Sequence, residues 1–325
     1  MTTPRRASPA SSPGASPSRA ALLTRVALLT LSAVLVGAGL AYPLTSGPVT
    51  HAAGRAARSP SPESAHGSAS CVAGGWDCSW SPRFAAASAL VGPAPGNPAF
   101  ILYDRRTGAR HTAGPAGRVS WTGSTSKLAL VTYALEEARS GAQPLTADIR
   151  DDLGLMLHVS DDEAATRVWE HYGADDLTEV FRDRYGMTGL EMAGTNNDWG
   201  ALACRPADLV ALMTHVLDRL HPEDRAWVVA AMRSVGDVQR WGVWGAGPAQ
   251  RPGVKNGWLD AGDDVSGWNT ITVGFFGPGE RYVLAAMYPM PAEPGSIAAG
   301  GQLLTDLAAI LAGQPTPAPA TFPDE

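Results

Sequence analysis

The chain has 325 residues and a mass of 33.8 kDa, which suits one large domain with appendages or two small domains. Hydrophobic residues make up 45% and charged residues 17%, which excludes a chain that is disordered throughout. A net charge of -6 argues against a general nucleic-acid binder, which needs a basic face. Three cysteines are too few for a disulfide scaffold, and the seven histidines lack metal-ligand spacing. We therefore expect neither a metal nor another cofactor.

The N-terminal region has the pattern of an export signal. Residues 1–25 contain four arginines and no acid, and the seventeen residues 26–42 carry no charge. A basic flank before an apolar run predicts a cytoplasmic N-terminus and an extracytoplasmic body. The run is long for a signal peptide and short for a membrane span, so it fits a cleaved signal or a retained anchor. We favour the anchor, which would attach the protein to the membrane.

Two segments outside the body are poor in periodic pattern. Residues 43–82 are rich in Ser, Pro, Gly and Ala and are expected to form a flexible tether. Near its end, Cys71 and Cys78 would form a small disulfide loop in an oxidising compartment, the alternative being two free thiols. Cys204 would then be unpaired and buried. The Pro-rich tail, residues 314–325, is expected to be disordered.

The body, residues 83–313, begins with a strand over 98–103, a turn at 105–108 and a second strand through 111. Helices are predicted over 124–140, 145–159, 162–172, 175–185, 206–220 and 222–235, strands over 253–259, 268–276 and 281–288, and a last helix over 301–312. This order predicts an α+β fold: one antiparallel sheet, with strands from both ends of the domain, and an inserted all-helical region.

Lysine is rare in this chain. Of the 25 Lys and Arg residues only Lys127 and Lys255 are lysines, which leaves 23 arginines. A lysine can lose its proton when its pKa is lowered, whereas an arginine cannot. Lys127 follows Ser124 by three residues at the start of a predicted helix, so the two share a helix face and a neutral lysine could activate the hydroxyl. The alternative is a capping serine beside a solvated lysine.

Two further segments carry residues of the same kind. Lys255 lies in a predicted strand just before Gly257, and a glycine there lets a ligand approach the backbone. The alternative is an exposed strand lysine beside a bulge. Ser160 and Asp161 precede a predicted helix, where a simple N-cap is the alternative.

In this order the three segments resemble the motifs of the penicillin-recognising serine hydrolases, the superfamily of class A β-lactamases and D,D-peptidases. The family motifs are S-x-x-K, S-D-N and K-T-G. The chain has STSK at 124–127, SDD at 160–162 and KNG at 255–257. The resemblance covers about residues 83–313 and is to a compact, actinobacterial type.

The resemblance implies a role for each matching residue. Ser124 would be the nucleophile that forms an acyl-enzyme, Lys127 its base, and Ser160 the donor of a proton to the leaving nitrogen. Lys255 would attract the substrate carboxylate. The backbone N–H groups of Ser124 and Trp258 would form the oxyanion hole. The substrate-binding residues would be Asp162, Asn256, Gly257 and Trp258.

The chain departs from the family pattern at three points. Asp162 replaces an asparagine, cannot donate a hydrogen bond when ionised, and could keep Lys127 protonated. Asn256 replaces a threonine, which is a milder change. The deacylating glutamate of class A enzymes has no counterpart near Glu191 or at 196–199.

Two functions therefore remain open at this point. The first is an exported, monomeric serine hydrolase that acts on β-lactams or on D-Ala-D-Ala-type cell-wall peptides. The second is a wall-binding or sensor protein that keeps the fold and has lost turnover.

Overall fold

The computed structural model describes residues 72–173, 176–194, 197–261, 267–291 and 295–323. Its main feature is a five-stranded antiparallel sheet with the order β4-β3-β10-β9-β8. The strands are β3 (Ala99–Asp104), β4 (Arg110–Ala113), β8 (Gly253–Asp260), β9 (Trp268–Phe276) and β10 (Tyr282–Pro289). The sheet thus joins strands from both ends of the domain, which confirms the predicted α+β fold.

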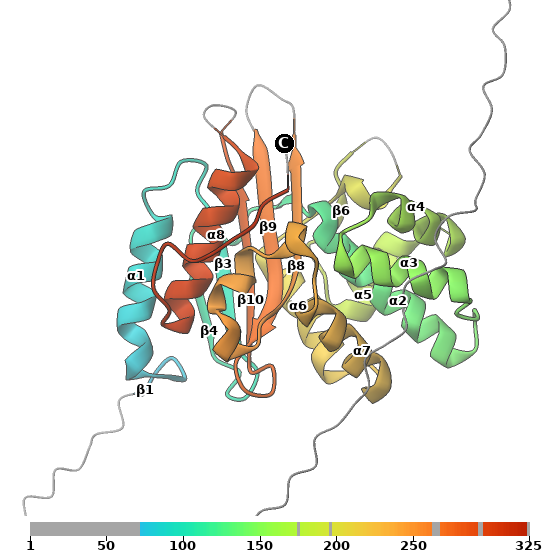
Figure 1. The fold of residues 1–325 in the computed structure, drawn as a ribbon, viewed down its shortest axis with the longest axis horizontal. Coiled ribbons are helices and arrows are strands. Elements are labelled where there is room, and N and C mark those ends of the chain that lie inside the picture. Colours follow the sequence, from blue (N-terminus) through green and yellow to red (C-terminus); the bar gives the residue numbers. More distant parts are fainter. Residues whose placement is uncertain (1–71, 174–175, 195–196, 262–266, 292–294, 324–325) are drawn as a thin grey trace, which may run out of the picture. The chain divides into compact units, whose positions relative to one another are not determined.

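Helices cover both faces of this sheet (Figure 1). On one face lie α1 (Ser81–Val91) and α8 (Ile297–Ala312). On the other face, α6 (Pro206–Asp218) packs on β3, β9 and β10 and leads into the helical region. That region also holds α2 (Lys127–Ser140), α3 (Ala147–His158), α4 (Asp162–His171), α5 (Leu177–Tyr185) and α7 (Pro222–Arg233).

The alternation of side chains along each strand divides the core in two. In β3, Phe100 and Leu102 pack with α1 and α8, whereas Ile101 packs with the helical region. Successive residues of a strand point to opposite faces, so a sheet covered on both sides needs apolar residues at nearly every position. This is why the strand sequences read as continuous apolar runs.

Two small sheets complete the described part. One pairs β1 (Val72–Ala73) with β2 (Trp76–Asp77), and the other has the order β5-β7-β6. The strands of the latter are β5 (Ser120–Trp121), β6 (Glu191–Met192) and β7 (Leu202–Cys204). The second sheet brings the segment before α2 next to the segment that follows α5.

The folded body extends past both expected ends. Trp76 and Trp80, expected within the tether, are buried and pack on Phe84 and Tyr282. Helix α1 was not predicted from the sequence, because only Ala87 and Val91 of this alanine-rich segment are buried and its periodicity is weak.

The tail also differs from the expectation of disorder. The N–H of Ala318 donates to Asp306 of α8 at 2.7 Å, and the ring of Phe322 lies 6.5 Å from that of Trp241. Proline-rich composition predicted a loose segment, but these contacts fasten residues 314–323 to the body.

Several expectations fall on the N-terminal segments. Residues 1–25, the apolar run 26–42 and Cys71 lie outside the described residues. Cys78 is disulfide-bonded, and Cys204 is a free, buried cysteine. Among the helices that the structure describes, none is long and apolar enough to cross a membrane.

Candidate functional site

Ser124 lies in a tight turn that is pressed against the edge strand β8. The turn is a single 3-10 segment, η2 (Gly123–Ser126), which leads directly into α2. Gly123 has φ +48°, and a Cβ built on Gly257 would lie 2.8 Å from the backbone nitrogen of Ser124. Such a distance excludes any side chain at 257. The glycine therefore allows β8 to approach the serine backbone, whereas the sequence pattern had suggested the close approach of a ligand.

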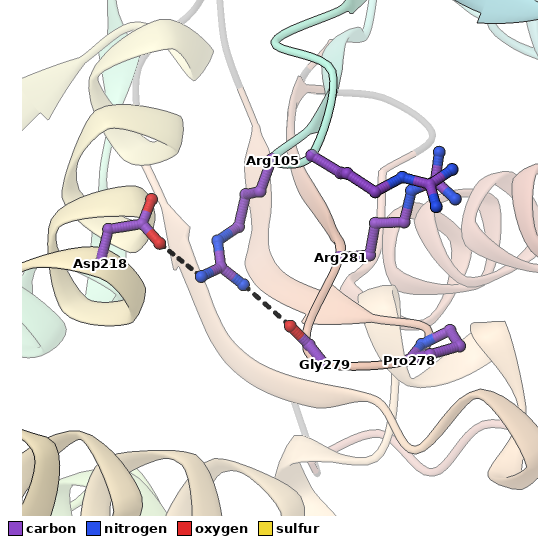
Figure 2. Close-up of a pocket in the computed structure, with 6 residues that line it drawn as sticks. Arg105, Asp218, Pro278, Gly279 and Arg281 are labelled. Atoms are coloured by element: carbon purple, nitrogen blue, oxygen red, sulfur yellow. Dashed lines mark hydrogen bonds and ion pairs between the residues drawn. The ribbon is translucent and has the colours of Figure 1, made fainter.

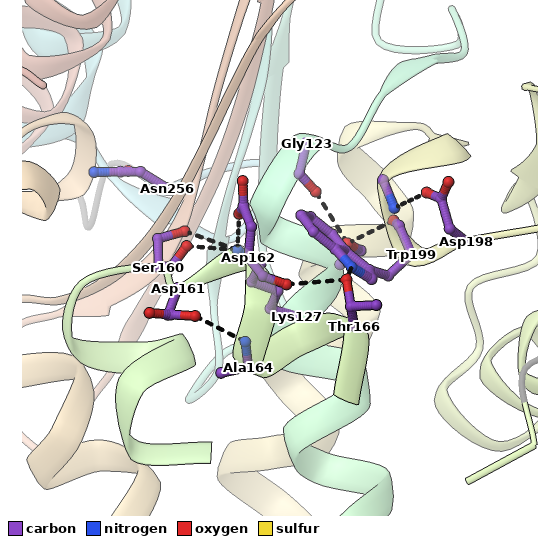
Figure 3. A network of polar contacts seen from close by, with 12 residues as sticks. Gly123, Lys127, Ser160, Asp161, Asp162, Ala164, Thr166, Asp198, Trp199 and Asn256 are labelled. Atoms are coloured by element: carbon purple, nitrogen blue, oxygen red, sulfur yellow. Dashed lines mark hydrogen bonds and ion pairs between the residues drawn. The ribbon is translucent and has the colours of Figure 1, made fainter. Parts of the chain in front are cut away.

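Lys127, the first residue of α2, is fully buried. Its ammonium donates to the carbonyl oxygen of Ser160 at 2.6 Å and to Oδ1 of Asp162 at 2.5 Å, and it lies 3.4 Å from Oγ of Ser160. Figure 3 shows these contacts. Within the described residues, the lysine hydrogen-bonds to Ser160 and Asp162 and not to Ser124. The alternative of a solvated lysine is wrong.

Ser160 connects the end of α3 to the start of α4 and has φ +66°. A serine in the left-handed region costs free energy, and such residues persist where the surroundings hold them. Here the conformation brings both the carbonyl and the hydroxyl of Ser160 within reach of a buried lysine. The next residue, Asp161, caps α4 by accepting from the N–H of Ala164 at 2.7 Å. The N-cap interpretation thus holds for Asp161.

Lys255 reaches the same serine from the sheet. It is also fully buried, and its ammonium donates to Oγ of Ser160 at 2.8 Å. Its other acceptors are Oε1 of Gln239 at 3.2 Å and the carbonyl of Asn256 at 2.7 Å. The only two lysines of the chain therefore meet at one hydroxyl, although they lie 128 positions apart in the sequence. The alternative of an exposed strand lysine is therefore wrong for Lys255.

Burial dominates the electrostatics of both amines. It lowers the pKa of Lys127, and the hydrogen bond and charge of Asp162 oppose part of that change. Burial also lowers the pKa of Lys255, to well below its usual range, and repulsion from Lys127 lowers it further. Each lysine can therefore exist as a neutral amine at a lower pH than a solvated lysine can.

Backbone donors lie beside the serine. The N–H of Asn256 donates to Gln239 rather than to β9, so Asn256 and Thr272 form a pair without ladder hydrogen bonds. Residues two apart in a strand direct their N–H groups to the same side. The N–H of Trp258 therefore points away from β9, as that of Asn256 does. A Cβ on Gly123 would lie 3.0 Å from this nitrogen. The amide of Trp258 thus faces the turn that carries Ser124.

The predicted substrate-binding residues differ in their exposure and in the direction of their side chains. The side chain of Asp162 is 73% exposed and covers the buried Lys127. Asn256 is fully buried and points away from Ser160, because its amide donates to the carbonyls of Gln239 and Trp241. Asn256 therefore holds the loop that covers β8 and does not face the lysines.

Trp199 is a contact of Lys127 that the sequence patterns did not reveal. Its ring lies 4.3 Å from the lysine ammonium, its indole N–H donates to Oγ1 of Thr166, and its carbonyl accepts from Ser126. Cationic groups are attracted to the face of a tryptophan ring. Among the described residues, Asp162 is the only acid paired with Lys127. No sequence signal distinguished Trp199 from other tryptophans.

A pocket of about 400 Å³ lies elsewhere, at the turn between β9 and β10 (Figure 2). Two of its three arginines are paired, Arg105 with Asp218 and Arg281 with Asp104. We therefore do not take it as the functional site. In the part of the chain that the structure describes, no group of three or more His, Cys, Asp or Glu residues could hold a metal ion.

Comparison with known proteins gives the fold. No protein-family model matches the chain. A protein named "Putative lipoprotein LppW", from Mycobacterium bovis and Mycobacterium tuberculosis, is 28% identical over 201 residues, which cover 59% of this chain and 63% of that protein. The chain thus spans less than two thirds of the length of these curated relatives.

Solved structures of class A β-lactamases and of PBP-A are similar to most of the chain. An ancestral class A β-lactamase has a TM-score of 0.59 at 16% identity, covering 71% of this chain and 99% of its own. A β-lactamase from Xanthomonas campestris has a TM-score of 0.58 at 18% identity, covering 72% and 97%. PBP-A has a TM-score of 0.57 at 19% identity, covering 71% and 95%. The chain has the fold of the class A β-lactamases and PBP-A, and it is a distant homologue of the mycobacterial LppW proteins.

Proposed function

We propose that the protein is an exported serine acyl-hydrolase in which Ser124 is acylated by β-lactams or by D-Ala-D-Ala-type cell-wall peptides. The observation that carries this proposal is the meeting of two buried lysines at Ser160, next to the turn that bears Ser124. A serine hydroxyl is a weak nucleophile near neutral pH and needs a base. Lys127, whose pKa is lowered by burial, can be that base in its neutral form.

The remaining groups have consistent roles in this mechanism. The hydroxyl of Ser160 lies between the two amines and can pass a proton to the leaving nitrogen of the substrate. The amides of Ser124 and Trp258 flank the position of a developing oxyanion, where preorganised donors are most effective. Lys255 has three acceptors inside the protein, so it offers a substrate carboxylate its charge rather than a free N–H.

Release of the acyl group is expected to be slow. Trp199 and Asp162 occupy two sides of the Lys127 ammonium. Trp199 has no basic group, and the carboxylate of Asp162 is hydrogen-bonded to the ammonium, so neither is a free base that could activate water for deacylation. Slow release also favours the second candidate, a wall-binding or sensor protein that keeps the fold and has lost turnover. The lipoprotein relative supports export, with the apolar run 26–42 as the membrane anchor.

The test is mass spectrometry of the intact protein after incubation with a fluorescent penicillin, together with nitrocefin hydrolysis. A stable adduct on the wild type that is lost in S124A supports acylation with slow release. Fast nitrocefin turnover would show a β-lactamase. An absence of adduct over the pH range 6–10 would refute acylation and leave a binding protein.

A further inference from the structure

Gln239 connects the loop before β8 to both the backbone and the lysine of that strand. It is the last residue of the 3-10 segment η4 (Asp237–Gln239) and is fully buried. Its Oε1 accepts from the N–H of Asn256 at 2.8 Å and from the ammonium of Lys255 at 3.2 Å. Its own carbonyl accepts from Nδ2 of Asn256 at 2.9 Å. Gln239 therefore hydrogen-bonds to β8 on the edge where, among the described residues, no further strand pairs with it.

The orientation of the Gln239 amide is fixed by its surroundings. Both groups that approach its outer atom, an ammonium and a backbone N–H, are donors, so this atom must be the oxygen. If the amide were flipped, its NH₂ group would face the ammonium and the backbone N–H, and donors would then face donors. Its Nε2 lies buried without a hydrogen-bond partner among the described residues, so the oxygen alone holds the side chain.

We infer that Gln239 is the positioning residue for Lys255: its neutral oxygen fixes the ammonium beside Ser160 without supplying a countercharge. The three acceptors of Lys255 are a hydroxyl, an amide and a backbone carbonyl, none of which is charged. A carboxylate at 239 would accept the same hydrogen bonds but would compensate the ammonium. When protonated, Lys255 then has no hydrogen-bonded countercharge and would select acyl donors that carry a carboxylate, which deepens the proposed function and rests on it.

The first test is independent of catalysis. Because Lys127 and Lys255 are the only lysines, protein labelled with ¹³Cε-lysine gives two side-chain signals whose titration midpoints are the two pKa values. Q239E is expected to raise the pKa of Lys255 by about one pH unit or more, since it adds an opposite charge at hydrogen-bond distance. Q239M removes the acceptor and is expected to lower the same pKa. Q250E, the same change at a half-buried residue of the preceding turn, is expected to leave it unaltered.

The second test uses benzylpenicillin and its neutral methyl ester as acyl donors. In Q239E the rate constant for benzylpenicillin divided by that for the ester is expected to fall about tenfold, which corresponds to about 1.4 kcal/mol. The new carboxylate weakens the attraction of Lys255 for the anionic substrate and leaves the neutral ester unaffected. Equal losses on both substrates, or Lys255 midpoints that do not move in opposite directions in Q239E and Q239M, would overturn the inference. If the wild type accepts neither substrate, acylation itself fails, and the titration still decides the role of Gln239.

Discussion

Removal of the Asp162 charge is expected to make Lys127 a stronger candidate base at neutral pH. The Lys127 ammonium lies 2.5 Å from Oδ1 of Asp162, and the side chain of Asp162 is 73% exposed. Because water surrounds the carboxylate, its attraction must be taken near the dielectric of water rather than of a protein interior. Coulomb's law then gives about 1.7 kcal/mol at this distance, or about one pH unit in the pKa of Lys127.

D162N should therefore lower the pKa of Lys127 by about one pH unit and raise the rate of acylation at pH 7 up to about tenfold. The assay is the ¹³Cε-lysine titration, followed by the rate of Ser124 acylation as a function of pH, whose acidic limb should move to lower pH. D161N is the matched control, because it removes a neighbouring charge that acts on Lys127 more weakly than Asp162 and makes no hydrogen bond to it, and asparagine caps a helix as well as aspartate does. A Lys127 midpoint that is unchanged in D162N, or that moves equally in D161N, would refute the reasoning.

Three further changes test other parts of the structure. W199A opens one side of Lys127 to water and should shorten the lifetime of the acyl-enzyme, measured by mass spectrometry over time; an unchanged lifetime would contradict the shielding role. Burial lowers the pKa of His111, so the unfolded state binds the proton first and stability is lost as pH falls below about 6.5. H111F keeps the stacking on Phe84 and should weaken this loss in urea unfolding at pH 7 and 5, whereas an equal loss in both proteins would exclude His111 as its source. F322A should lower the free energy of unfolding by about 1–2 kcal/mol, and no change would mean that the tail contributes little.

The order of elements could be predicted because each segment carries its own periodic signal. The apolar strands, the helical block and the closing helix follow from local spacing. Helix α1 and the tail could not be predicted, since Ala87, Val91 and Phe322 are placed by packing rather than by periodicity. The aromatic residues Trp76 and Trp80 likewise belong to the core only through rings that are distant in sequence, such as that of Tyr282.

The candidate site divides in the same way. Ser124, Lys127, Ser160 and Lys255 could be chosen as candidates because their three segments match, in order, the motifs of a known family, although each segment alone is a weak signal. That Asn256 turns away and that Trp199 covers Lys127 could not, because neighbours remote in the chain decide the direction of a side chain.

The sequence alone determined which chemical groups are available: two lysines among 25 basic residues, each near a serine or a glycine. Only the tertiary structure decided that both amines are buried at one hydroxyl, because folding brings α2, β8 and the loop at Ser160 together. Desolvation and the repulsion between the two amines, which lower their pKa values, arise only in that arrangement. A pKa is a property of the surroundings of a group, and the chain has those surroundings only once it is folded.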